Sequence, residues 1–151
     1  RFWPAAARKA VRFCLLKTGL PGTGPMAKSK ASEPGVVRLK TRPQFLFVRA
    51  GKSERRKALV VQARSRAGSQ AIGAGFTATK KIGNAVIRNR AKRRLREASR
   101  QLLPLHGVAG ADYVFIARMD TATIGWQRLL DDMESALISL AKDFSAGTGP
   151  A

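Results

Sequence analysis

Residues 79–96 read TKKIGNAVIRNRAKRRLR, and this segment decides what the rest of the chain must form. Between residues 80 and 100 there are nine Lys or Arg and a single acid, Glu97. An apolar residue nevertheless recurs every three or four positions, which is the period of one helix face. These apolar positions are Ile87, Ala91, Leu95, Ala98 and Leu102. The segment therefore predicts a basic helix that packs through this stripe and keeps its charge in water.

The two ends of the basic helix can also be predicted. Asn84 follows Gly83 and is a preferred N-cap residue, because its side-chain oxygen can accept a hydrogen bond from an unpaired amide of the first turn. Pro104 lacks the amide that a continuing helix would use. We therefore expect the helix to run from about Asn84 to Leu103, with His106 in the loop that follows.

The charged side of this helix suits RNA. Arg offers a planar fork of donors that matches pairs of phosphate oxygens, and Asn89 adds a neutral group suited to a base edge or a 2′-hydroxyl. A charged surface that served only solubility would mix signs, so contact with a nucleic acid is the preferred interpretation. The predicted RNA-binding residues are Lys80, Lys81, Asn84, Arg88, Asn89, Arg90, Lys92, Arg93, Arg94 and Arg96.

The composition supports this interpretation. The chain has 151 residues and a formal net charge of +20 at pH 7, which favours nucleic acid over an acidic protein or a membrane surface. Hydrophobic residues make up 44% of the chain, enough for the modest core of one domain. Residues 101–151 hold only three basic residues against six acidic ones, so we expect this last third to act as scaffold.

The cysteine and hydropathy patterns indicate a cytoplasmic protein. Cys14 is the only cysteine, which excludes an intrachain disulfide and a Cys-rich zinc site and fits a reducing cytosol. No apolar run approaches the roughly 20 residues that span a bilayer, so we expect no membrane partner.

Residues 1–36 are expected to form a basic, disordered extension, because prolines and glycines punctuate them and no apolar period is sustained. Their Arg-rich start also fits an organellar transit peptide, and residues 11–16 fit a weak signal segment that Arg12 interrupts. Met26 is an alternative start, which would make residues 1–25 the product of upstream reading. The folded domain is expected over residues 37–144, and residues 145–151 are expected to be a disordered tail.

Further helices and strands are expected around the basic helix. Helices are predicted at residues 42–50 and 123–143, and strands at residues 57–64, 71–79 and 112–118. The most apolar strand, at residues 112–118, should lie centrally. The last helix should bury Trp126, Leu129, Leu130, Met133, Leu137 and Leu140 and expose Asp131, Asp132 and Glu134. This order predicts an α+β sandwich with helices packed on a central sheet.

The basic segment closely resembles the signature of the bacterial ribonuclease P protein subunit family. It carries Lys80-Lys81-Ile82-Gly83-Asn84-Ala85-Val86 and then Arg88-Asn89-Arg90 and Lys92-Arg93, without a gap, and weaker similarity covers roughly residues 37–142. The resemblance implies an α-β-β(-β)-α-β-α sandwich with a left-handed β-α-β crossover, against the usual right-handed rule. It also implies that the protein binds the catalytic RNA subunit through this helix and holds the 5′ leader of precursor tRNA in a cleft, which promotes 5′ maturation of tRNA.

The same resemblance implies where the leader would lie. In this family the cleft is formed by the first helix and the exposed sheet face, and the matching positions are Phe45, Val60, Gln62, Thr77 and Thr79. Phe45 would stack on an unpaired base and contribute about 1–3 kcal/mol to the free energy of binding. The alternative interpretation is that Phe45 belongs to the core. Family members often have a second aromatic near Val48 and a tyrosine where Gln62 stands, so we expect weaker stacking here.

Residues for protein-based catalysis are not recognisable. A protein nuclease generally uses clustered carboxylates with metal ions, or His and Lys groups for acid–base chemistry. The acids of this chain are few and scattered, and His106 is its only histidine. We therefore predict no catalytic residue and no metal ligand in the protein. The resemblance implies that the RNA subunit is the catalyst, that it binds most of the Mg²⁺, and that the protein is a monomer in a one-to-one ribonucleoprotein.

Other functions stay open from the residues alone. A basic ribosomal protein or an RNA chaperone would have much the same size and charge. A DNA-binding helical module would need a helix-turn-helix or dimer pattern, which we do not find. A protein-only nuclease is the least favoured, given the missing carboxylates. The ungapped signature around Arg88 favours the ribonuclease P protein subunit.

Overall fold

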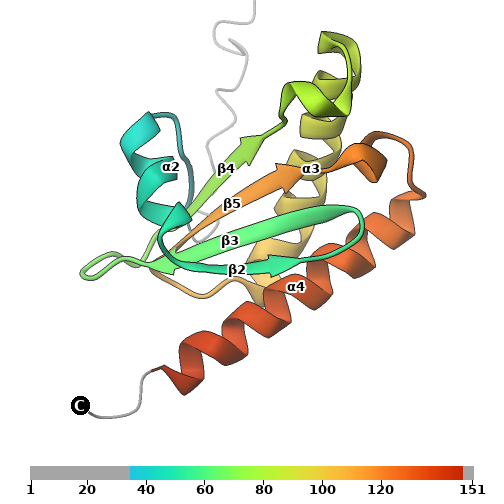
Figure 1. The fold of residues 1–151 in the computed structure, drawn as a ribbon. Coiled ribbons are helices and arrows are strands. Elements are labelled where there is room, and N and C mark those ends of the chain that lie inside the picture. The colour runs from blue at the N-terminus through green and yellow to red at the C-terminus, as the bar shows by residue number, and fades with distance from the viewer. Residues whose placement is uncertain (1–34, 148–151) are drawn as a thin grey trace, which may run out of the picture. The chain divides into compact units, whose positions relative to one another are not determined.

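The computed structural model describes residues 35–147, which form an α+β domain (Figure 1). Its elements follow one another as β1 (Val36–Arg38), α2 (Arg42–Arg49), β2 (Lys52–Arg55), β3 (Leu59–Ser65), β4 (Ile72–Thr77), the 3-10 turn η1 (Lys80–Ile82), α3 (Ala85–His106), β5 (Ala111–Ala117), the 3-10 turn η2 (Met119–Ala122) and α4 (Trp126–Ala146). Most of the expected extension therefore lies outside the described residues. The expected tail starts later than residue 145, because α4 continues to Ala146.

The sheet has five strands in the order β1-β4-β5-β3-β2. β5 is parallel to β4 on one side and antiparallel to β3 on the other, which confirms the prediction of a central strand. The edge strands β1 and β2 were not recognised individually from the sequence pattern. Both are short and mostly exposed, so they lack the alternation of apolar and polar residues that marks a half-buried strand.

The connection from β4 through α3 to β5 has the handedness that the family resemblance implies. The two strands are parallel neighbours. In Figure 1 both point to the right, β5 lies below β4, and α3 passes behind the sheet, so the crossover is left-handed.

Alternate residues of the three inner strands belong to two separate apolar clusters. Val61, Ala74 and Phe115 are buried in the larger cluster together with side chains of α3 and α4. We call this side of the sheet the closed face. Val114 is buried instead with Leu39 and Val48, beside α2. We call this opposite side, which among the helices of residues 35–147 is covered by the eight-residue helix α2, the open face.

The basic helix α3 ends later than predicted. It continues through Pro104 to His106, so His106 lies in its last turn and not in a loop. A proline removes one intrahelical hydrogen bond, and near the end of a helix this loss is tolerated. Leu103 is fully buried and accepts a hydrogen bond from the Gly107 amide at 2.8 Å, which holds the last turn together.

The last helix, α4, buries Leu129, Met133, Leu137 and Leu140, as predicted. Leu130 is only half-buried, and Trp126 remains 37% exposed, so their predicted burial was wrong. Asp132 is the opposite case, because it is buried although the pattern placed it in water. Its Oδ2 accepts a hydrogen bond from the Ala58 amide at 3.1 Å, an acceptor role that hydropathy periodicity does not reveal. None of the helices over residues 35–147 is long and apolar enough to cross a membrane.

Candidate RNA interface

The basic helix begins at a well-defined cap. The Asn84 side-chain oxygen accepts a hydrogen bond from the Ile87 amide at 3.0 Å, which confirms the predicted N-cap. Gly83, immediately before it, has a φ of 141°, in the region that favours glycine. Lys80 and Lys81 are exposed on the turn that precedes this glycine. Asn84 therefore fixes the helix start with its side-chain oxygen, while the two lysines extend the basic surface beyond it.

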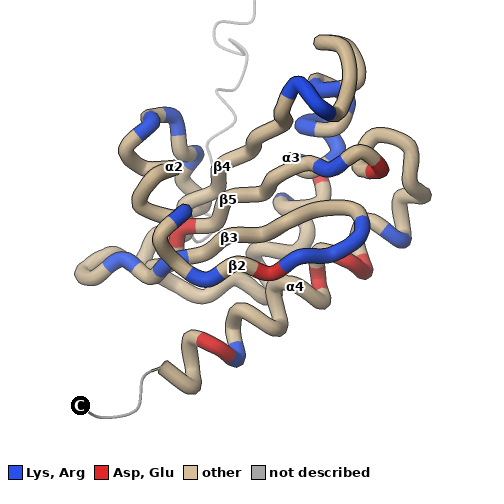
Figure 2. The backbone as a smooth tube through the Cα atoms, in the orientation of Figure 1, with Lys and Arg blue, Asp and Glu red and all other residues tan. Residues whose placement is uncertain are grey.

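The outward side of α3 carries exposed polar and basic groups on a rigid base. Asn89, Arg90 and Arg93 are exposed. Ala91 and Leu95, on the opposite side of the same helix, are fully buried. Figure 2 shows Lys and Arg along η1 and the first turns of α3, whereas acidic residues lie along α4. The helix thus holds its charges at fixed positions, as predicted from the apolar period.

The first turn of α3 lies beyond the ends of the strands (Figure 1), which alters the environment of two residues. Ile87 is 38% exposed, although the apolar stripe predicted its burial. Arg88 is half-buried, and so is Lys92 one turn later. These two basic residues lie on the flank of the candidate interface, beside the exposed Asn89, Arg90 and Arg93.

Arg94 makes contacts within the protein that the sequence pattern does not show. Its guanidinium donates to the carbonyl oxygen of Thr121 at 2.8 Å and also to that of Ile124. Burial, and secondarily the neighbouring charge of Arg90, lower the pKa of Arg94. Because two backbone acceptors hold donors of its guanidinium, Arg94 links α3 to the segment that contains the η2 turn, and its role in RNA binding stays a prediction.

Arg96 is also turned partly inward. It is half-buried, and its guanidinium carbon lies 5.9 Å from the centroid of the Phe76 ring. Phe76 in turn stacks on Phe115 at 5.5 Å on the closed face. Arg96 therefore covers the edge of the core with its side chain, and it contributes less exposed charge than its position in the sequence suggested.

The predicted cleft residues on strands lie on the open face. Thr77 is paired with Ile116, and Ile116 with Val60, so these three form one row across the sheet. Gln62 lies in the next row, opposite Val114. Thr79 differs, because β4 ends at Thr77 and Thr79 is an exposed residue at the start of η1. Its predicted place on the strand was therefore wrong.

Phe45 extends from α2 over the sheet. It is half-buried against Leu39, Val48 and Val114, away from the larger core on the closed face. Gly75 allows this approach, because a Cβ atom at residue 75 would lie only 2.7 Å from Cε1 of the Phe45 ring. The ring thus covers part of the open face and keeps one portion accessible.

Two basic residues of the open face, Arg55 and Arg64, were not predicted from the sequence. Arg64 donates to the Phe47 carbonyl oxygen at 3.2 Å, and its guanidinium carbon lies 4.2 Å from the Phe47 ring centroid. Arg55 is exposed and paired with Val60, so its side chain is on the same face. The alternation of strand residues could have identified Arg64, because it lies two positions beyond Gln62.

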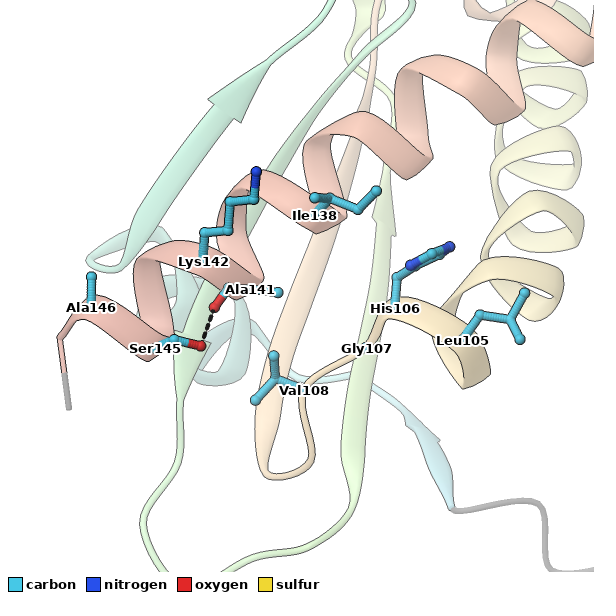
Figure 3. A pocket seen from close by; sticks show the side chains of 9 residues that line it. All are labelled: Leu105, His106, Gly107, Val108, Ile138, Ala141, Lys142, Ser145 and Ala146. Carbon is cyan, nitrogen blue, oxygen red and sulfur yellow. Dashed lines mark hydrogen bonds between the residues drawn. The ribbon is translucent and has the colours of Figure 1, made fainter.

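A separate groove of about 660 Å³ lies between the ends of α3 and α4 (Figure 3). Its lining is mostly apolar and includes Leu105, Val108 and Ile138. His106 lies at this groove, with its Nε2 3.2 Å from Glu134 Oε1. Over residues 35–147, no three His, Cys, Asp or Glu side chains form a group that could hold a metal ion.

Comparison with known proteins identifies the family. A family model described as Ribonuclease P matches residues 34–141. The chain is 55% identical over 111 residues to the ribonuclease P protein component of Caulobacter vibrioides, covering 73% of this chain and 74% of that protein. It is 46% identical over 119 residues to the component of Ruegeria pomeroyi, covering 77% and 95%.

Solved structures give the same result for the fold. The Staphylococcus aureus RNase P protein matches with a TM-score of 0.60 and 27% identity, covering 71% of this chain and 96% of that one. The RNase P protein from Thermotoga maritima matches with a TM-score of 0.57 and 27% identity, covering 68% and 96%. With a family model that matches most of its length and a relative of this identity, the chain belongs to the ribonuclease P protein family.

Proposed function

We propose that this chain is the protein component of ribonuclease P, acting in the cytoplasm as a monomer in a one-to-one complex with the catalytic RNA. The observation that carries the proposal is the exposure of polar and basic side chains on the outward side of α3. Asn89, Arg90 and Arg93 are exposed there, while Ala91 and Leu95 fix the same helix in the core. Such a surface offers phosphate and base-edge donors at fixed spacing, which is suited to a folded RNA.

The open face supports the second half of the proposal, the binding of the single-stranded 5′ leader of precursor tRNA. Proteins that bind single strands combine an aromatic stacking surface with positive groups along a groove. Phe45 supplies the aromatic ring over the sheet, and Arg55 and Arg64 supply positive charge from β2 and β3. Val60 and Thr77 provide a flat surface between them.

Catalysis is assigned to the RNA subunit in this proposal. Within residues 35–147, the acidic side chains form no group suited to a metal ion, and the one histidine lies at the groove between α3 and α4. The Mg²⁺ that hydrolysis of the precursor requires would therefore be held mainly by RNA phosphates. The protein would contribute binding energy and orientation.

Reconstitution tests the proposal directly. The purified chain is added to the cognate RNA subunit at low Mg²⁺, and cleavage of precursor tRNA at the start of the mature sequence is measured. We expect cleavage to be restored by the protein and absent without it. RNA binding without any gain in cleavage would favour a general RNA chaperone instead.

A single substitution tests the α3 surface. Arg93→Ala removes one exposed guanidinium from α3. We expect weaker binding to the RNA subunit, and a slope of log affinity against log salt that is lower by about one unit, because one phosphate contact is lost. The matched control is Lys142→Ala, which removes one exposed charge from the far end of α4. Equal affinity and slope in Arg93→Ala, Arg88→Ala and the unmodified chain would remove α3 from the interface.

A further inference from the structure

Trp126 is exposed at a position where its sequence context predicts burial. It is the first residue of α4 and precedes the fully buried Leu129 by three positions, which places both on one side of the helix. The first turn of α4 extends past the end of the sheet (Figure 1). Trp126, the first residue of this turn, is 37% exposed.

The indole lies beside the basic helix. The guanidinium carbon of Arg94 is 5.9 Å from the centroid of the Trp126 ring, within the range of a cation–π contact. Arg94 is itself held by the carbonyl oxygens of Thr121 and Ile124, on the segment that leads into α4. The ring is thus positioned by a group that is already fixed, and little side-chain entropy remains to be lost when a ligand packs against it.

The surroundings of Trp126 favour a neutral planar group over a phosphate. Met119, in the η2 turn, is 63% exposed and adds apolar surface to this segment. Asp120 and Asp131 are exposed acids on the same segment, and Asp131 accepts a hydrogen bond from Gln127 at 3.1 Å. Acids disfavour phosphate at this place, whereas Arg90 on α3 provides a positive charge close to Arg94.

We propose that Trp126 stacks on an unpaired base of the RNA that α3 binds, so that the RNA interface continues from α3 onto the first turn of α4. The proposal rests on the proposed function, because it takes the catalytic RNA as the ligand. Phosphates of the bound strand lie along Arg90 and Arg93, and the base lies against the indole. In this proposal Arg94 acts as a positioning residue that holds the indole of Trp126 in place.

Fluorescence provides the first test. The chain has two tryptophans, Trp3 and Trp126, so Trp3→Phe leaves the indole of Trp126 as the only tryptophan signal. Titration of this variant with the RNA subunit is expected to quench and shift the emission, because a base stacks on the ring. An emission unchanged at RNA concentrations that saturate binding overturns the proposal.

Affinity provides the second test. Trp126→Leu keeps an apolar side chain beside Arg94 but removes the ring, and Trp126→Phe restores an aromatic surface. We expect Trp126→Leu to weaken binding to the RNA subunit about tenfold or more, and Trp126→Phe to recover most of the loss. The control is Ile138→Ala, which alters an apolar residue of the same helix that is also 37% exposed, at the distant groove. Thermal melts of all variants show whether folding is retained.

The outcomes separate this inference from the proposed function. If Arg93→Ala weakens RNA binding while Trp126→Leu does not, the proposed function stands and the stacking role of Trp126 is wrong. Equal losses in Trp126→Leu and Ile138→Ala also overturn it, because they indicate a general effect of apolar truncation. If the unmodified chain does not bind the RNA subunit, the proposed function itself fails.

Discussion

The two faces of the sheet are built from the same strands and differ in almost every other respect. On the closed face, Val61 and Phe115 have no exposed surface, because α3 and α4 lie over them. On the open face, their chain neighbours Val60 and Ile116 are half-buried, and α2 is the one helix of residues 35–147 that packs there. One step along a strand therefore separates a core position from a position available to a ligand.

The difference teaches where sequence variation changes stability and where it changes binding. The closed face is mostly apolar along its inner strands, whereas the open face carries Gln62, Arg64 and Thr77 among its apolar residues. Polar side chains on a half-exposed sheet face can stay hydrated, so they cost the fold little free energy. Their contacts with water can be replaced by contacts with RNA. We expect substitutions on the closed face to alter unfolding, and those on the open face to alter the affinity for the leader.

The largest effect is expected from Phe115→Ala. Phe115 is fully buried and its ring stacks on Phe76 with centroids 5.5 Å apart, so truncation leaves a cavity at the centre of the closed face. We expect a loss of about 3–5 kcal/mol in the free energy of unfolding, measured by urea denaturation. A loss below about 1 kcal/mol would mean that the closed face is not the main core.

Phe45→Ala is expected to have a smaller effect and to act mainly on binding. If the ring stacks on a leader nucleotide, the holoenzyme should lose about 1–3 kcal/mol in affinity for precursor tRNA. Mature tRNA, which has no leader, serves as the control and should bind almost as before, and so should the RNA subunit. Equal losses for both tRNA forms together with a lowered melting temperature would assign Phe45 to packing alone.

The finest comparison is between two matched substitutions on β3, whose stability losses should differ by only about 1 kcal/mol. Val61→Ala removes two methyl groups from the closed face, and Val60→Ala removes the same groups from the open face. From about 0.8 kcal/mol for each buried carbon group, we expect a loss of about 2 kcal/mol for Val61→Ala and under about 1 kcal/mol for Val60→Ala. Urea denaturation of both variants measures the difference. Equal losses would show that the two faces are buried to the same extent.

Much of the fold could be predicted from the sequence because its strongest signals are local. The apolar period of α3, the cap at Asn84 and the apolar run of β5 each depend on residues that are close in the chain. The edge strands β1 and β2 could not be predicted from the sequence, and the reason is physical. Only one side of such a strand is paired and neither side is buried, so the selection that produces alternating residues is weak.

The candidate site was predicted less completely, because periodicity shows on which side of a helix a residue lies but not which group its side chain contacts. Arg94 was assigned to RNA by its position in a basic run, yet its acceptors are carbonyl oxygens of residues 121 and 124, far away in sequence. Asp132 was assigned to water, yet it accepts from the amide of Ala58. In both cases a long-range contact with a backbone group decided the outcome, and no local pattern encodes such a contact.

The central position of β5 has a consequence for the synthesis of the chain. β3 and β4 are translated first, then the 22 residues of α3, and only afterwards the strand that joins the two halves of the sheet. Until β5 has left the ribosome, α3 lacks its contacts with β5, η2 and α4, and an isolated helix is marginally stable in water. A nascent chain that ends before residue 111 therefore carries the basic residues without the geometry that arranges them. The fixed arrangement of these basic residues arises late, when the last strand and α4 complete the domain.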